Sequence, residues 1–231
     1  MRDTWFASSG GCSWDGVFVV GDLTKSNSLS PEQRDEFARR IDEEVKQYND
    51  LLVLDVEESW RESLTYKSAA LVQLAHRSGA KWLFKTDDDS YLNVPQLLDT
   101  LNEMDFKKPT YGGEIWWRSK VIREKAHKFY VSEEQWPEPY YPPYASGAGY
   151  FISKAAVTKM LPEIATSTFI PMEDACIGVM MHNIGILTPV DLALQPKHCV
   201  QRSHSTRRNF VSVRPPLRRL ATSASTFCAT I

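Results

Sequence analysis

Apolar and polar residues alternate in blocks along the first hundred positions, and these blocks predict strands and helices in turn. Short apolar runs, each followed closely by a glycine or an aspartate, are typical of buried strands, and they occur at 17–20, 51–54 and 81–84. Between them, apolar residues recur at helical spacing over 31–48 and 62–76. A further helix is expected to open after Asn93.

Two local signals place helix boundaries. Ser30, Pro31 and Gln33 supply an N-cap, a proline at the first helical position and the partner residue of a capping box. Gly79 is a typical helix stop. Strands that alternate with helices at this spacing predict right-handed crossovers. The sequence therefore predicts an α/β fold with a mostly parallel central sheet flanked by helices.

The pattern changes after about residue 110. Residues 112–150 are rich in glycine, proline, tryptophan and tyrosine and show no clear period. A stretch of this length predicts a functional segment or one that contains short strands. Helices are expected again over 154–161 and from 173 through 181. Beyond 195 the composition shifts to arginine, serine, threonine and proline, so we divide the chain into a domain at 1–195 and a poorly ordered tail at 196–231.

Bulk composition narrows the class of protein. The chain has 231 residues, is 42% hydrophobic and 24% charged, and suits one globular domain. A net charge of -2 gives no support to a nucleic-acid partner. The sequence shows no membrane-length apolar run and no signal-peptide pattern. The four cysteines (Cys12, Cys176, Cys199 and Cys228) form no CxxC pair, which argues against zinc and leaves disulfide pairing open.

Three consecutive carboxylates, Asp87, Asp88 and Asp89, follow the third predicted strand. Adjacent carboxylates repel one another unless a cation neutralises them, and hard divalent cations prefer oxygen ligands. The carboxyl ends of strands in α/β folds bind nucleotides and phosphates. The triplet therefore predicts a site where Mn²⁺ or Mg²⁺ bridges protein carboxylates to a diphosphate. The alternative is an acidic turn that caps the helix after Asn93.

Five segments in this order and spacing resemble the β-1,3-glycosyltransferases of glycosyltransferase family 31, over about residues 2–190. The segments are 2–5, 18–21, 85–89 with the following Asn93-Val94, 141–150 and 173–178. The resemblance implies a single-domain GT-A fold, Mn²⁺ (or Mg²⁺), a UDP-sugar donor and transfer with inversion. One departure is Ala145, which stands where the family has a cysteine.

The implied activity is transfer of a hexose, with galactose favoured, from a UDP-hexose to the 3-hydroxyl of a glycan on a glycoprotein or glycolipid. Family members are usually anchored in the Golgi membrane with the catalytic domain on the lumenal face. The resemblance also implies that the family's first strand, anchor and stem are missing here. A sheet without that strand would expose a central edge. An inactive relative that binds glycans or a protein partner is therefore the alternative function.

The resemblance also assigns roles around the metal and the nucleotide. Asp89 is expected to contact the metal directly, while Asp87 and Asp88 serve the nucleotide or reach the metal through water. Arg2, in the first matching segment, is assigned to donor binding. The family uses a C-terminal histidine as a further metal ligand. His198 is the candidate here, and a solvated tail histidine is the alternative.

Asp174 is the candidate general base, and Glu173 is its rival. Both open a predicted helix, where a carboxylate is stabilised by the helix dipole. The structural alternative is that Asp174 serves only as the N-cap of this helix. The resemblance favours Asp174 as the base and leaves Glu173 as a substrate contact.

Small and aromatic residues complete the predicted site. Gly147 and Gly149 allow backbone to approach a sugar ring closely, or they serve tight packing of the strand that follows. Trp117 and its aromatic neighbours at 116, 136, 140, 141 and 144 offer faces that stack on sugars, although aromatics are also ordinary core residues. A metal-dependent phosphotransferase would share the acidic strand end, but the sequence has no P-loop motif.

Overall fold

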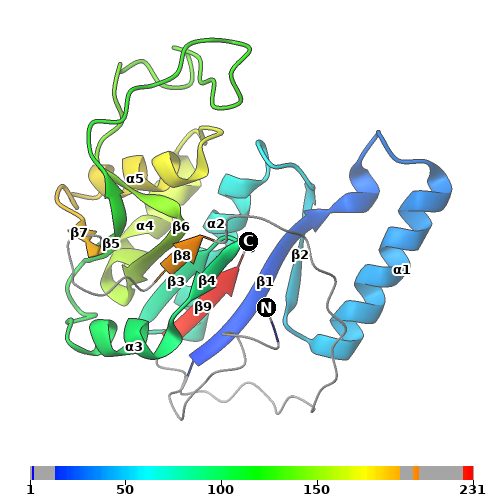
Figure 1. Ribbon diagram of the computed structural model, residues 1–231, viewed down its shortest axis with the longest axis horizontal. Helices are drawn as coiled ribbons and strands as arrows, with labels where there is room; N and C mark the ends of the chain where they lie inside the picture. The colour runs from blue at the N-terminus through cyan, green and yellow to red at the C-terminus, as the bar shows by residue number, and fades with distance from the viewer. Residues whose placement is uncertain (1, 3–13, 193–199, 203–225, 231) are drawn as a thin grey trace.

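The computed structural model of the protein describes residues 2, 14–192, 200–202 and 226–230. Strands and helices alternate through its first half, as the sequence predicts (Figure 1). The helices are α1 (Pro31–Tyr48), α2 (Leu64–Ser78), α3 (Val94–Asn102), α4 (Lys154–Thr166), α5 (Glu173–Asn183) and the short 3-10 helix η2 (Leu23–Lys25). The strands are β1 (Trp14–Asp22), β2 (Leu51–Glu57), β3 (Trp82–Thr86), β4 (Ser90–Leu92), β5 (Tyr111–Trp116), β6 (Tyr144–Ser153), β7 (Val190–Asp191), β8 (Val200–Arg202) and β9 (Thr226–Thr230).

The central sheet has seven strands in the order β2-β1-β9-β3-β6-β5-β7. The pairs β1–β2, β1–β9, β3–β9 and β5–β7 are parallel, whereas β3–β6 and β5–β6 are antiparallel. A second, two-stranded sheet pairs β4 with β8 in antiparallel fashion. The predicted α/β class is confirmed, and the central sheet is mixed.

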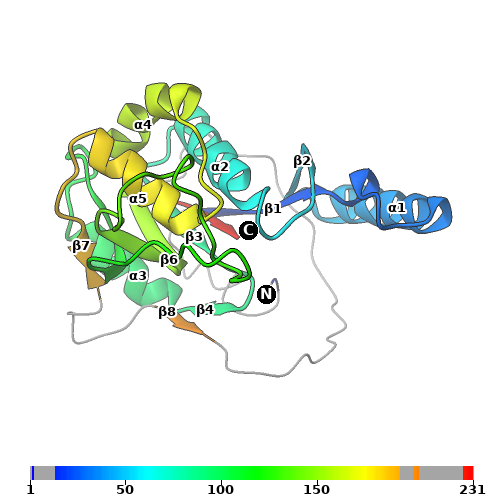
Figure 2. The same ribbon diagram turned by 90° about the horizontal axis from the view of Figure 1, so that it is seen from above.

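Helices cover both faces of the sheet. Figure 2 shows α2, α4 and α5 on one side and α3 on the other. Strand β3 is buried throughout because Leu83 joins the core under α2, α4 and α5, while Trp82 and Phe84 join the core under α3. Since side chains alternate along a strand, Lys85 and Asp87 continue the row of Leu83. The chemistry at the end of β3 therefore faces α5.

The predicted helix boundaries are confirmed where capping chemistry marks them. Helix α1 begins with the Ser30–Gln33 capping box, with both of its hydrogen bonds present. Helix α2 ends at Gly79, whose φ of 71° lies in the left-handed region. The Asn93 side chain accepts a hydrogen bond from the backbone N–H of Gln96 at the start of α3.

Strand β9 fills the centre of the sheet, so the expectation of an exposed central edge is not met. Thr226 pairs with both Trp14 and Trp82, and Thr230 pairs with both Phe18 and Thr86. Figure 1 shows β9 in red between β1 and β3. The strand comes from the segment predicted to be a tail, and residues 203–225 of that segment lie outside the described residues.

The aperiodic region contains strands, as the sequence predicts. Strand β5 and the start of β6 lie within it, and the excursion between them rises above the sheet (Figure 1). Arg123 holds this excursion together by donating hydrogen bonds to the backbone oxygens of Val131, Trp136 and Glu138 at 2.5–3.1 Å. Among the helices that the structure describes, none is long and apolar enough to cross a membrane.

Candidate active site

The aspartate triplet forms the turn between β3 and β4. The backbone N–H of Ser90 donates to the backbone oxygen of Asp87 at 3.2 Å. Asp88 and Asp89 are exposed, and Asp87 is half-buried. Because Asn93 itself caps α3, the alternative of a helix-capping acidic turn does not hold. The triplet instead presents carboxylates at the end of a buried strand.

Lys85 is a buried cation next to the triplet, with 1% of its surface exposed. Its Nζ donates to Asp87 Oδ1 at 2.5 Å, to the Gly147 backbone oxygen at 2.9 Å and to Glu173 Oε2 at 3.2 Å. Burial lowers the pKa of Lys85, but the charges of Glu173 and Asp87 more than offset that effect and leave the pKa above its usual value. The lysine is therefore a permanent positive charge.

Glu173, the first residue of α5, is buried within a hydrogen-bond network. Its Oε1 accepts from Ser68 Oγ and from Tyr150 Oη, the latter at 2.7 Å, while Oε2 accepts from Lys85. Both oxygens are thus occupied by protein partners. This arrangement is that of a structural support, and the predicted roles of Glu173 as a rival base or a substrate contact stay predictions.

Asp174, the next residue, lies half-buried in the first turn of α5. Its Oδ2 accepts from the Gly147 N–H at 3.2 Å and its Oδ1 from the Ala175 N–H at 2.9 Å. Burial and then the charge of Glu173 raise the pKa of Asp174 to about 6, against the opposing effects of Lys85 and the two N–H groups. The N-cap of α5 is Met172, so the reading of Asp174 as an N-cap does not hold.

Gly147 lies next to both the aspartate triplet and the candidate base Asp174. A Cβ at this position would lie 3.5 Å from Asp87 Oδ2, 3.5 Å from Lys85 Nζ and 3.7 Å from Asp174 Oδ2. A side chain here would fill the space between the triplet and the candidate base. Gly149, by contrast, is a ladder residue opposite Thr86, as the packing alternative describes.

Two other predicted residues lie away from this group. Arg2 donates to Asp50 through two nitrogens, both at 2.8 Å, and its guanidinium lies over the rings of Phe18 and Tyr48. Strands β1 and β9 separate that position from β3. Trp117 is half-exposed, and its Nε1 donates to Asp191 Oδ2 at 3.5 Å beside β7.

His198 lies outside the described residues, so its role stays a prediction. Within the part of the chain that is described, no group of three or more His, Cys, Asp or Glu side chains is arranged to hold a metal ion. Cys176 is a free thiol in the core, and burial raises its pKa to about 12. It therefore belongs to the packing of α5.

The aromatic residues divide into two sets. Trp136 stacks on Tyr141 at 6.1 Å between ring centroids, and Tyr141 meets Tyr144 edge-on at 6.0 Å, so these three rings pack against one another. Trp116, Trp117 and Tyr140 are about half exposed, so the prediction of a sugar-stacking ring stays with this second set. The alternative of ordinary core packing thus describes Trp136, Tyr141 and Tyr144.

Sequence reasoning missed the supporting network of Lys85, Ser68 and Tyr150. Only Lys85 carried a usable signal, because a charge that follows three apolar residues in a buried strand needs a specific partner. Ser68 and Tyr150 come from α2 and β6, and no local pattern relates them to Glu173.

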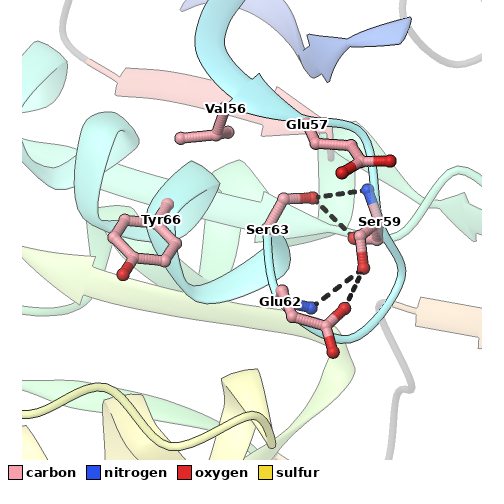
Figure 3. Close-up of a pocket in the computed structure, with 6 residues that line it drawn as sticks. All are labelled: Val56, Glu57, Ser59, Glu62, Ser63 and Tyr66. Atoms are coloured by element: carbon pink, nitrogen blue, oxygen red, sulfur yellow. Dashed lines mark hydrogen bonds between the residues drawn. The ribbon is translucent and has the colours of Figure 1, made fainter. Parts of the chain in front are cut away.

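A pocket of about 290 Å³ opens between the end of β2 and the start of α2. Hydrogen bonds between Ser59 and Ser63, and between Ser59 and Glu62, close the loop beside it (Figure 3). The lining residues are Val56, Glu57, Ser59, Glu62, Ser63 and Tyr66. None of these residues belongs to the predicted active site, so the pocket is distinct from the group around Lys85 and Asp174.

In this α/β fold, the buried strand β3 thus ends in carboxylates, and Asp174 of raised pKa lies near them at the start of α5. Residues 1–190 match the family described as Galactosyltransferase, and the chain belongs to that family.

Individual relatives carry more specific names. The chain is 30% identical over 201 residues to beta-1,3-galactosyltransferase 4 of Rattus norvegicus, covering 74% of this chain and 52% of that protein. The Homo sapiens protein of the same name is 28% identical over 221 residues (82% and 55%). UDP-GlcNAc:betaGal beta-1,3-N-acetylglucosaminyltransferase 7 of Rattus norvegicus is 24% identical over 198 residues (80% and 47%). The chain spans about half the length of these curated relatives.

Proposed function

We propose that this protein is an inverting β-1,3-hexosyltransferase that moves a hexose, with galactose favoured, from a UDP-sugar to the 3-hydroxyl of a glycan. Membership of the galactosyltransferase family and the names of its relatives support the reaction class. The observation that carries the proposal is that Asp87 and Asp174 both lie within 4 Å of the position a Cβ of Gly147 would take. A GT-A arrangement, a glycoprotein or glycolipid acceptor and a place on the lumenal face of the Golgi membrane belong to the same proposal.

The donor set of the triplet fits a divalent cation. Mg²⁺ and similar ions are commonly bound by one or two carboxylates together with substrate phosphates, and the exposed Asp88 and Asp89 offer such carboxylates. We assign direct contact to Asp89, with Asp87 and Asp88 on the nucleotide side and His198 as a further ligand. Mn²⁺ bound there would neutralise charge on the diphosphate.

The remaining chemistry belongs to Asp174. Its carboxylate accepts the proton of the acceptor's 3-hydroxyl as that oxygen attacks the anomeric carbon. The bond from this carbon to the UDP oxygen breaks, and its electron pair leaves with UDP. Attack from the face opposite UDP inverts the anomeric centre. The pKa of about 6 keeps Asp174 ionised and still basic near neutral pH.

Calorimetric titration of UDP with and without Mn²⁺ tests the donor site. We expect binding that requires the metal and that is lost in Asp89→Asn. Asp55→Asn is the matched control, because Asp55 is an exposed carboxylate at β2 that pairs with Lys25. Absence of metal-dependent binding in the unaltered chain would reject the enzyme and favour the glycan- or partner-binding alternative.

The donor sugar needs a second experiment. UDP release from UDP-galactose, UDP-N-acetylglucosamine and UDP-N-acetylgalactosamine, each with a mixed set of glycan acceptors, ranks the donors. We expect UDP-galactose to give the highest kcat/KM. A higher value for either N-acetylhexosamine donor would reassign the sugar and leave the reaction class unchanged.

A further inference from the structure

We propose that Lys85 is a positioning residue that fixes the distance between the donor-side carboxylate Asp87 and the base Asp174. The proposal rests on the function proposed above and adds a residue to it. Lys85 itself is buried, and its Nζ is bonded to protein acceptors, so we propose that it acts through them.

The first observation is that Lys85 joins three elements at one atom. An ammonium has three N–H groups, and three acceptors lie within 3.2 Å of Lys85 Nζ. Asp87 belongs to the turn after β3, Gly147 to β6 and Glu173 to α5. Every donor of the ammonium is matched, so its position and the positions of its three partners determine one another.

The second observation is that two short routes lead from Lys85 to Asp174. Lys85 binds the backbone oxygen of Gly147, and the Gly147 N–H binds Asp174 Oδ2 at 3.2 Å. Lys85 also binds Glu173, the residue directly before Asp174 on α5. Ser68 and Tyr150 hold the other oxygen of Glu173, which fixes the start of the helix against α2 and β6.

The third observation is the chemistry of the position. Lys85 continues the row of Leu83, which faces the apolar core, and an apolar side chain would avoid the desolvation of a charge there. Replacing a buried ion pair by apolar residues is often neutral or stabilising. An apolar side chain could therefore fill this buried position, and the presence of an ammonium there is explained by the carboxylates that it binds.

The experiment compares Lys85→Met, the double variant Lys85→Met/Glu173→Gln and the control Lys67→Met. Lys67 is also a buried lysine paired with a glutamate at 2.5 Å, but that partner, Glu58, directly follows β2 and belongs neither to the turn after β3 nor to α5. For each variant we measure the melting temperature, the Kd of UDP with Mn²⁺, and kcat at saturating donor and acceptor.

We expect both single variants to lose melting temperature, since each leaves a carboxylate without its cation. The double variant should recover part of the loss of Lys85→Met, because it removes the unpaired charge of Glu173. The transfer rate should distinguish the Lys85 variants from Lys67→Met. In both Lys85 variants kcat should fall roughly 100-fold, the scale expected for a misplacement of about 1 Å, and the affinity for UDP should fall by much less. In Lys67→Met kcat should stay near that of the parent.

A double variant that folds, binds UDP and transfers at the parent rate would overturn the proposal. An equal loss of kcat in Lys67→Met would do the same, because it would show a general effect of removing a buried lysine. If Lys85→Met alone fails to fold, the double variant still decides. Failure of the proposed function has a different signature. The unaltered chain would then show no Mn²⁺-dependent UDP binding, while the melting temperatures would still report the contribution of the Lys85 contacts to stability.

Discussion

Glu173 and Asp174 are neighbouring carboxylates that the fold separates into different chemical roles. Glu173 is enclosed by Ser68, Tyr150 and Lys85, which occupy both of its oxygens. Asp174 has two backbone N–H partners and a raised pKa. The charge of the first residue contributes to the raised pKa of the second, which supports the proposed division into a structural support and a base.

Replacing Asp174 by asparagine should abolish transfer and spare donor binding. The amide keeps the size of the side chain but cannot take the proton, and general-base catalysis is typically worth roughly 10²–10⁴-fold in rate. Initial rates of UDP release and calorimetric titration of UDP with Mn²⁺ measure the two effects. Asp99→Asn, on the exposed side of α3, is the control. Simultaneous loss of UDP binding and transfer in Asp174→Asn would contradict the assigned role.

Transfer should rise with pH through about 6 as Asp174 ionises. The titratable groups around it are Glu173, Lys85 and the hydroxyls of Tyr111 and Tyr144, and burial raises the pKa values of both tyrosines. The kcat profile at saturating substrates measures the midpoint, with UDP affinity followed over the same range as the control. A rate that stays flat down to about pH 5 would contradict the assignment.

The raised pKa of Asp174 also makes the free energy of unfolding depend on pH. A carboxyl whose pKa is higher in the folded protein than in the unfolded chain binds its proton more tightly when folded. The contribution of Asp174 is therefore favourable below its ordinary pKa and is lost as pH rises through about 6. Asp174→Asn should remove that part of the dependence, which denaturant unfolding at a series of pH values can measure.

At the scale of elements, the contact of α5 with β6 sets the position of the base. A Cβ at Gly178 would lie 2.3 Å from Tyr144 Cβ and 3.1 Å from Tyr144 Cα. Helix α5 can approach β6 this closely only because residue 178 has no side chain. Asp174 lies four residues earlier, on the same side of the helix, so the glycine determines how near the base comes to Gly147.

Gly178→Ala should push α5 away from β6. We expect a loss of about 1–3 kcal/mol in the free energy of unfolding, as is typical of overpacking, together with a larger loss of kcat than of UDP affinity. Denaturant unfolding and the transfer assay measure the two. His182→Ala, at an exposed position one turn later on α5, is the control. Parent-like stability and rate in Gly178→Ala would show that the helix accommodates a methyl group without moving.

Elements with local signals were predictable from the sequence, and those held by distant partners were not. The ends of α1 and α2 follow from Ser30 and Gly79, which act on their own backbone. The triplet was identified by its place at the end of a strand, and Asp174 by the resemblance to glycosyltransferase family 31. Lys85 was missed as a positioning residue because two of its three partners, Gly147 and Glu173, lie on β6 and α5, and such long-range contacts leave no periodic trace.

At the scale of the whole molecule, β9 connects two parts of the sheet. Strands β2 and β1 lie on one side of it and β3, β6, β5 and β7 on the other. Among the described strands, β1 and β3 each pair with β9 and have no ladder to each other. The central sheet is therefore continuous only through residues 226–230.

Deleting residues 226–231 should destabilise β1, β2 and α1 more than the rest of the protein. Hydrogen exchange of the backbone amides should show lost protection in those elements while β5 and β6 keep theirs. Adding a synthetic peptide of residues 224–231 should restore protection, and a scrambled peptide is the control. Unchanged protection of β1 after the deletion would show that β9 is dispensable to the sheet.

The position of β9 also has a consequence for biosynthesis. Strands β1 and β3 are made early, whereas the strand that joins them follows all the other described elements. Until it arrives, the nascent chain holds two facing strands with open edges, and such edges readily pair with other chains. Completion of the sheet requires contacts between very distant parts of the sequence, which slows folding. The growing polypeptide should therefore depend on chaperones until β9 is synthesised.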